Sequence, residues 1–126
     1  MKPTNKVPIT KTVAMPKDTN ANGDIFGGWL MGQMDLAGAI IARDYAKGRI
    51  ATVAVDAMSF IAPVKIGDIV SCFGSVIKLG KTSITVKIEV TAARGHEEDI
   101  HLVTNGTFVY VAIDKLGKPR KILQSN

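Results

Sequence analysis

Cysteine is nearly absent from this sequence, and its one example, Cys72, excludes an internal disulfide framework and zinc sites that need two or four cysteine ligands. Aromatic side chains are also few, at 6% of the residues, and the basic residues are dispersed, which argues against a nucleic-acid-binding module. The first ten residues, MKPTNKVPIT, have no apolar core of the kind found in signal peptides, so we expect a cytoplasmic protein.

A long hydrophobic run without charge is lacking as well. The stretch from 25 to 42 is about long enough to cross a bilayer, but Gln33 and Asp35 lie at its centre, where a carboxylate in lipid is costly. Four glycines in the same stretch favour close packing against other parts of the chain. We therefore predict a buried helix and no membrane span.

The length and the charge both suit a single domain. We expect one unit over 1–126, with a core from about 7 to 114 and a loosely held basic tail at 115–126. Lys and Arg number 16 against 11 Asp and Glu, a net charge of +5, so an anionic partner fits and nucleic acid is not required. His96 and His101 flank an acidic run, which is typical of a solvated charge cluster, and we expect no metal site.

Hydrophobic periodicity predicts one helix and five strands. Apolar residues recur every three or four positions from about 27 to 47, as on the buried face of a helix. The segment 51–61 is apolar on both faces, which is typical of a strand buried on both. We predict an α+β fold in which a five-stranded antiparallel sheet, its last four strands forming a meander, wraps around one long central helix. The predicted strands are 7–15, 51–61, 69–79, 82–94 and 102–113.

The loop that leads into the predicted helix is the strongest candidate for a functional site. Gly27 and Gly28 fall in the first turn, where backbone N–H groups have no partner within the helix and could form an oxyanion hole. Asp24 lies just upstream, close enough to act as a general base on a water. The alternative is that Asp24 and Asn20 only cap the helix. Within the helix, Asp35 is more typical of a hydrogen-bonded structural carboxylate than of a catalytic one.

Several motifs carry a resemblance to a known family. The sequence N-A-N-G-D-I-F-G-G-W at 20–29, followed by M-x-Q-M-D at 31–35, resembles the signature of the YciA-type acyl-CoA thioesterases. The resemblance continues through T-V-A-V-D at 52–56, F-I-A-P-V-K-I-G-D at 60–68 and K-x-G-K-T-S at 78–83. It covers about nine-tenths of the chain and implies the hotdog fold, a long helix wrapped by an antiparallel sheet.

The resemblance also implies a mechanism and an assembly. Asp24 would orient or activate the attacking water, the amides of Gly27 and Gly28 would polarise the thioester carbonyl, and Asn20 would hold the water or fix the loop. The acyl pocket would lie between two protomers, lined by the partner's strand from Thr52 to Met58. The family forms dimers and commonly trimers of dimers. Coenzyme A would be part of the substrate and product, and no cofactor is implied.

The turn that ends the third predicted strand is a second candidate site. Gly80-Lys81-Thr82 is similar to the end of a P-loop, but position 75 is Ser and a strand follows, so the Walker A interpretation fails. The turn could still bind the phosphates of CoA through its amides, Lys81 and Ser83. Further candidates for phosphate contacts are Lys78, Arg94, Arg120 and Lys121. The alternative for each of them is an ordinary solvated charge.

Two other functions are compatible with such a fold. A hotdog dehydratase or hydratase needs a positioned Asp–His pair, and neither histidine is near the predicted helix start, which disfavours it. A non-catalytic acyl-CoA sensor usually carries a DNA-binding segment, and no helix-turn-helix fits in the short segment before the first strand. The leading hypothesis is therefore an acyl-CoA thioesterase.

Overall fold

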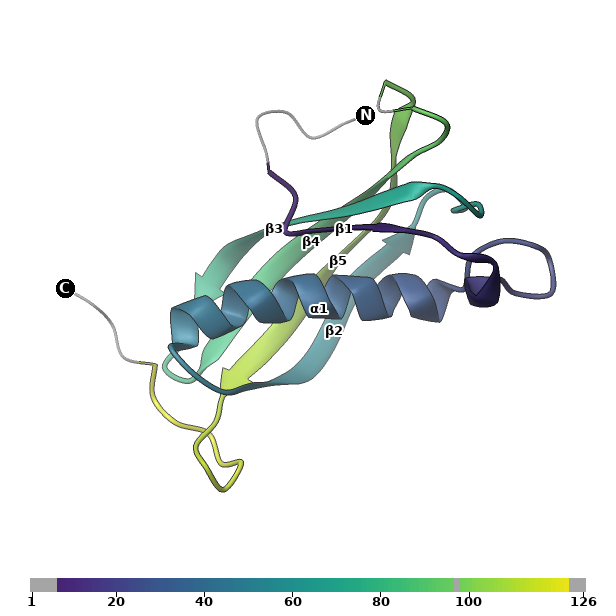
Figure 1. Cartoon of the computed structure of the whole chain (residues 1–126). Helices are drawn as coiled ribbons and strands as arrows, with labels where there is room; N and C mark the ends of the chain where they lie inside the picture. Colours follow the sequence, from purple (N-terminus) through teal and green to yellow (C-terminus); the bar gives the residue numbers. More distant parts are fainter. Residues whose placement is uncertain (1–6, 97, 123–126) are drawn as a thin grey trace.

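The computed structural model describes residues 7–96 and 98–122, which form one long helix packed against one antiparallel sheet (Figure 1). The predicted α+β order of a strand, a helix and four further strands is confirmed. A short 3-10 helix, η1, precedes the long helix. The elements are β1 (Thr10–Val13), η1 (Pro16–Asp18), α1 (Gly27–Ala46), β2 (Ile50–Phe60), β3 (Ile69–Leu79), β4 (Ser83–Ala93) and β5 (Ile100–Ala112).

The sheet has the strand order β1-β3-β4-β5-β2, so the predicted four-strand meander is wrong for β2. Strands β3, β4 and β5 are consecutive neighbours, but β2 pairs with β5 at the far edge, with Ile50 opposite Ala112. The connection from β2 to β3 explains the difference. Residues 61–68 include Pro63 and are too long for a tight hairpin, so β2 and β3 need not be neighbours.

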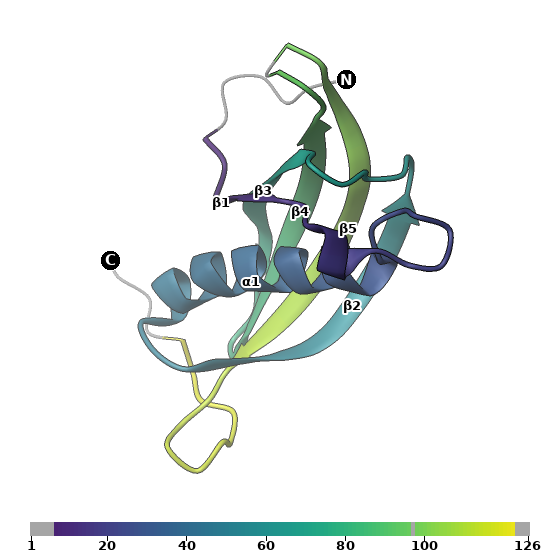
Figure 2. The same ribbon diagram turned by 45° about the vertical axis from the view of Figure 1, so that its right-hand side comes forward.

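The core lies between α1 and the face of the sheet that curves around it (Figure 2). On β4, the predicted inward face is confirmed, because Ile84, Val86, Ile88 and Val90 are fully buried. Among the described residues, no helix is long and apolar enough to cross a membrane. The helix contributes Leu30, Met34, Ala37, Ala42 and Ala46 to the core.

Strand β2 is poorly covered, which corrects the prediction that it is buried on both faces. Val53 is 57% exposed and Phe60 is 54% exposed. The reason is that β2 is an edge strand, and in the part of the chain that the structure describes no strand lies along its outer side. Leu36 and Ile40 on α1 are also more than half exposed. Apolar surfaces of this kind are typical of contacts with another protein chain.

The basic tail is tied to the body of the protein as far as Ile122. The N–H of Ile122 donates to the backbone oxygen of Lys81 over 2.8 Å. The guanidinium of Arg120 donates to the backbone oxygen of Ala46, at the end of α1, over 2.9 Å. The expectation of a loosely held tail is therefore wrong up to this residue, and 123–126 lie outside the described residues.

Candidate active site

A hydrogen-bonded loop leads into α1. The side-chain oxygen of Asn20 accepts hydrogen bonds from the backbone N–H groups of Asn22 (2.9 Å) and Asp24 (3.1 Å). The N–H of Asn20 donates to the backbone oxygen of Asp24 over 2.7 Å, and the N–H of Phe26 donates to that of Asp18 over 2.9 Å. Asn20 thus fixes the conformation of the loop and so the place where the helix begins.

The helix start has no side-chain cap. Phe26 occupies the N-cap position and makes no side-chain hydrogen bond there, so Asp24 does not act as a cap. The first-turn N–H groups, including those of Gly27 and Gly28, have no acceptor one turn earlier in the helix. A Cβ on Gly28 would meet no atom within 4 Å apart from its chain neighbours and the backbone of its own helix, whereas one on Gly27 would touch the Phe60 ring at 3.5 Å. The helix start is therefore accessible at Gly28 and lies close to the end of β2 at Gly27.

Asp24 forms an ion pair with Lys65, a residue that the sequence analysis did not single out. Lys65 follows Val64, whose backbone oxygen accepts the N–H of Ile25 over 3.0 Å. The side chains of Lys65 and Asp24 are 46% and 31% exposed, so the pair is open to solvent on one side. The only signal for Lys65 in the sequence is its place in the segment F-I-A-P-V-K-I-G-D.

A pocket of about 300 Å³ lies between this loop, the first turn of α1 and the end of β2. Asn20, Asp24 and Gly27 line it, and the segment from Phe60 to Val64 forms its apolar wall. The structure therefore brings together three of the four predicted catalytic residues, with Gly28 next in the chain. An apolar wall with a few convergent polar groups is typical of a small-molecule site.

Asp35 lies on α1 and is hydrogen-bonded, as the sequence analysis expected of a structural carboxylate. Its Oδ1 accepts the hydroxyl of Thr52 over 2.8 Å, and the hydroxyl of Tyr110 is 3.0 Å from both Oδ1 and the backbone oxygen of Asp35. Burial, then the charge of Asp35 and its hydrogen bond, raise the pKa of Tyr110 far above its usual value. Tyr110 therefore remains a hydrogen-bond donor at every ordinary pH. Among the described residues, these bonds leave Oδ2 of Asp35 without a partner.

The residues predicted to bind CoA phosphates lie at the other end of α1. Arg120 reaches Ala46, which is about 30 Å from Gly27 at a rise of 1.5 Å per residue. Lys81 is exposed beside the tail, and the hydroxyl of Ser83 lies next to Gly80. Within one chain, the structure does not bring these residues to the loop.

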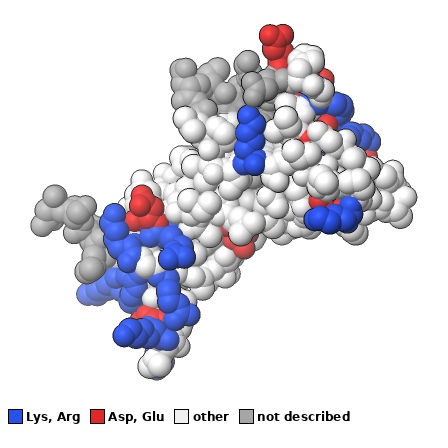
Figure 3. Space-filling model, in the orientation of Figure 1, with Lys and Arg blue, Asp and Glu red and all other residues white. Residues whose placement is uncertain are grey.

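Lysine and arginine gather at this end of the molecule, at the lower left of Figure 3. The guanidinium of Arg120 donates to backbone oxygens there, and its role in binding phosphate stays a prediction. Lys121 is exposed in the tail. The exposed cations that backbone contacts bring to this end are Arg43, Lys47, Arg49, Lys81, Lys115, Lys118 and Lys121.

Arg94, another predicted phosphate ligand, is paired with a buried carboxylate. Its Nε and Nη2 donate to the two oxygens of Asp68 over 3.0 and 2.9 Å, and the N–H of Lys65 donates to the same carboxylate over 2.9 Å. Burial raises the pKa of Asp68, but the hydrogen bonds from Arg94 and Lys65, together with the charges of Arg94 and His101, outweigh it and lower the pKa. The guanidinium of Arg94 is therefore already paired with a carboxylate of the same chain.

Comparisons with known proteins decide the family. The model of the thioesterase superfamily matches residues 22–98, a range that includes most of the loop, α1, and β2 to β4. The acyl-CoA thioester hydrolase YciA of Salmonella typhimurium is 50% identical over 117 residues, which are 90% of this chain and 88% of the relative. The chain belongs to the thioesterase superfamily. The protein is therefore an enzyme, and its class is thioester hydrolase.

Solved structures agree with this assignment. A hexameric hotdog-fold thioesterase of Campylobacter jejuni is 45% identical, with a TM-score of 0.87 over 92% of this chain and 90% of that one. The hotdog fold of this thioesterase is therefore confirmed. An acyl-CoA hydrolase of Staphylococcus aureus, described in complex with butyryl-CoA and CoA, is 29% identical, with a TM-score of 0.83 over 90% and 69% of the two chains. Two alanine variants of the S. aureus enzyme have also been solved. One replaces an asparagine, and the other replaces an aspartate fifteen positions later in that sequence.

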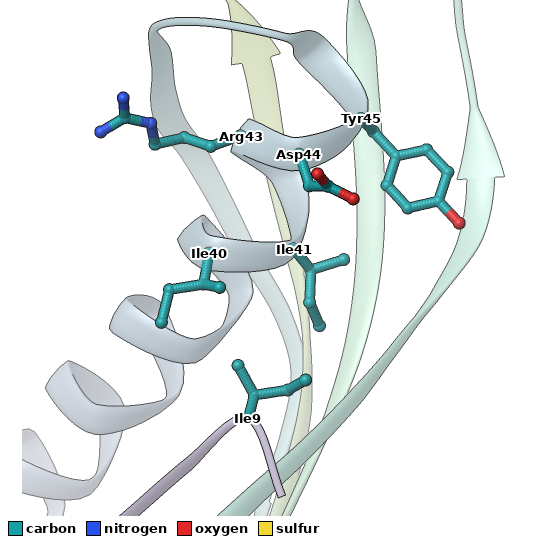
Figure 4. Close-up of a pocket in the computed structure, with 6 residues that line it drawn as sticks. All are labelled: Ile9, Ile40, Ile41, Arg43, Asp44 and Tyr45. Atoms are coloured by element: carbon teal, nitrogen blue, oxygen red, sulfur yellow. The ribbon is translucent and has the colours of Figure 1, made fainter. Parts of the chain in front are cut away.

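The thioesterase has a second hollow, of about 680 Å³, at the end of α1 opposite to the loop. Ile9, Ile40 and Ile41 gather in it between the helix and the segment before β1, while Arg43 points away from them (Figure 4). Ile40 is 54% exposed, so the hollow continues the bare apolar surface of α1. Neither described histidine lines this hollow or the pocket at the loop.

The two residues predicted for the acyl pocket lie on β2. The exposed Thr52 donates its hydroxyl to Asp35, as described above, and so lies beside the helix. Met58 is partly buried and packs over Gly106 against the core of the thioesterase. Both residues therefore belong to the edge strand of the sheet.

Proposed function

We propose that the protein hydrolyses acyl-CoA thioesters to a free acid and coenzyme A. The observation that carries the proposal is the pocket that Gly27, at the start of α1, shares with Asn20 and Asp24. The naming of relatives as acyl-CoA hydrolases, and the butyryl-CoA complex of the S. aureus enzyme, support the same substrate class here. Coenzyme A is part of the substrate and the product, and the proposal includes no cofactor.

The first step of the proposed reaction is the addition of water to the thioester carbonyl carbon. The water gives one proton to a carboxylate, and the carbonyl oxygen becomes an oxyanion. The N–H groups of Gly27 and Gly28, together with the positive end of the helix dipole, stabilise this charge. The tetrahedral intermediate then re-forms the carbonyl as the C–S bond breaks. The protonated carboxylic acid returns its proton to the sulfur of the departing CoA.

Asp24 and Asp35 are both candidates for the carboxylate. Sequence position favours Asp24, but its Oδ1 is engaged by Lys65. The alanine variants of the S. aureus enzyme favour Asp35, because Asn20 and Asp35 are the only asparagine and aspartate of this sequence with the same order and spacing. We propose Asp35 as the general base, with Asp24 as the alternative.

A base at Asp35 requires a second protomer. Asp35 lies eight residues after Gly27, about 12 Å along the helix, too far for both to act on one thioester within one chain. A partner packed on the bare faces of β2 and α1 would supply the missing group, and Thr52 and Met58 would line the acyl pocket at that contact. A dimer is thus the proposed active unit, and the hexameric relative from C. jejuni supports a trimer of dimers. Light scattering tests this proposal, and active monomer would contradict it.

The test of the reaction is steady-state kinetics on acyl-CoA substrates from acetyl to palmitoyl. We expect turnover by the wild type, a fall in kcat of roughly 10²–10⁴ for Asp35→Asn, and a loss of about tenfold for Asp24→Asn through misplacement of the loop. The opposite order of losses would assign the base to Asp24. Absence of turnover on every acyl-CoA would favour a sensor and reject the proposed function. The cytoplasmic location stays a prediction.

A further inference from the structure

The ion pair between Lys65 and Asp24 joins the active-site loop to the connection between β2 and β3. The two residues are 41 positions apart, and their contact is the side-chain link between these segments beside the pocket. A backbone hydrogen bond from Ile25 to Val64, over 3.0 Å, lies directly next to it. Two neighbouring residues of the loop are thus held by two neighbouring residues of the connection.

On its own side, the backbone of Lys65 is bonded to the buried carboxylate of Asp68, which is paired with Arg94. The carboxylate of Asp68, whose side chain is 1% exposed, accepts the N–H of Lys65 and two hydrogen bonds from Arg94. The N–H of Asp68 donates back to the backbone oxygen of Lys65 over 3.0 Å, and the N–H of Ala14 donates to the backbone oxygen of Asp68 over 3.0 Å. The backbone of Lys65 therefore has a defined position from which its side chain extends.

On the other side, Asp24 controls the entry into α1. Its backbone is bonded to Asn20 through both its N–H and its oxygen, and only Ile25 and Phe26 separate it from Gly27. A displacement of Asp24 would therefore move the first turn of the helix. Short loops on the surface open locally at low free-energy cost unless tertiary contacts hold them.

We propose that Lys65 is a positioning residue of the active site. It holds Asp24, and with it the loop from 19 to 26, against the turn at 65–68, so that the N–H groups of Gly27 and Gly28 keep their place beside the pocket. The catalytic consequence of this role rests on the proposed function. An exposed ion pair adds little to global stability, so the effect is local to the loop.

Hydrogen–deuterium exchange on the intact oligomer tests the contact without any substrate. We expect the amides of residues 20–28 to exchange at least about fivefold faster in Lys65→Met than in the wild type, because the loop opens more often. Lys87→Met removes the same charge from an exposed position on β4 and serves as the matched control. Exchange in this segment that is unchanged by Lys65→Met would overturn the proposal, whatever reaction the protein catalyses.

Kinetics on acyl-CoA then test the positioning role. We expect kcat to fall about tenfold in Lys65→Met while KM changes less than about twofold, and Lys65→Arg to restore most of the loss. In an Asp24→Ala background, Lys65→Met should have no further effect, because the side chain that Lys65 binds is already gone. A normal kcat for Lys65→Met beside an active wild type, or losses that multiply in the double variant, would overturn the role. A wild type without turnover would reject the proposed function instead, and the exchange result would still decide whether Lys65 holds the loop.

Discussion

The hydroxyl of Tyr110 on β5 lies 3.0 Å from the Oδ1 of Asp35 on α1, so that a buried donor fixes one oxygen of a carboxylate that no sequence motif links to it. The same hydroxyl is 3.0 Å from the backbone oxygen of Asp35, which orients it along the helix. Thr52 donates to the same Oδ1 from β2. The carboxylate is thus held from two strands, and its Oδ2 is the oxygen from which a proposed general base would act.

The first prediction concerns this hydrogen bond. Tyr110→Phe keeps the ring and removes the hydroxyl, so we expect kcat to fall about tenfold with little change in KM, and the free energy of unfolding to fall by about 1–2 kcal/mol. Stopped-flow or steady-state hydrolysis of one acyl-CoA, together with thermal unfolding, measures both effects. Retention of more than half of the wild-type kcat would mean that Asp35 needs no orientation by Tyr110.

The second prediction concerns the glycine that makes room for Tyr110. A Cβ on Gly38 would fall well inside contact distance of the Tyr110 hydroxyl, so Gly38→Ala should displace the ring and lower both kcat and the melting temperature. The matched control is Gly32→Ala on the same helix, where a Cβ meets nothing within 4 Å. There, replacement of a helical glycine should raise stability by about 1 kcal/mol. Equal stability of the two variants would show that the helix can shift to accommodate the added methyl group.

Residues near one another in the sequence allowed much of this site to be predicted. Asn20, Asp24 and the two glycines lie within nine positions, and their loop follows from local turn and helix-start chemistry. Lys65 and Tyr110 could not be found in this way, because they reach the site from 41 and 75 positions away and only the fold brings them there. The position of β2 was missed for a similar reason. Its apolar pattern predicts that its side chains are covered, but it does not indicate which strand lies beside β2 or whether a second chain covers it.

The third prediction concerns acid stability. The pKa of Asp68 is below its ordinary value of 3.8 in the folded protein, so its contribution to stability is present above about pH 4 and is lost as the pH falls through the folded pKa. Asp68→Asn removes this contribution, and the difference in melting temperature between the variant and the wild type should therefore shrink from about pH 6 to about pH 3. Melting curves across this range measure it.

Arg94→Gln tests the contribution of the ion pair to stability separately from that of the Asp68 carboxylate. At neutral pH it leaves Asp68 ionised and buried without its cation, which should destabilise the protein by about 1–3 kcal/mol, discounted for the exposed guanidinium. Lowering the pH protonates Asp68 and should reduce this deficit as well. A difference in melting temperature that stays constant over the same pH range for both variants would show that the ion pair does not contribute to acid sensitivity.

The last prediction concerns the basic end of the molecule, where Lys81 and Lys121 are exposed beside the tail. These lysines would bind the nucleotide phosphates of a CoA whose thioester lies in the active site of a partner protomer. In that case KM for acyl-CoA should rise with salt, because ions screen exposed charges over ~8–10 Å. The kcat should change little, since the reacting atoms are far from this end. An acyl-pantetheine, which lacks the nucleotide, should have a higher KM that is nearly independent of salt.

Substitutions distinguish this role from a general effect of charge. Lys81→Ala should raise KM for acyl-CoA and leave the pantetheine thioester unaffected, whereas Lys87→Ala, on an exposed position of β4, should change neither. Arg120→Ala should instead lower the melting temperature, because its guanidinium joins the tail to the end of α1 through Ala46. Equal salt dependence for both substrates would assign the positive charge to solubility or assembly, and the phosphate role of Lys81 would have to be abandoned.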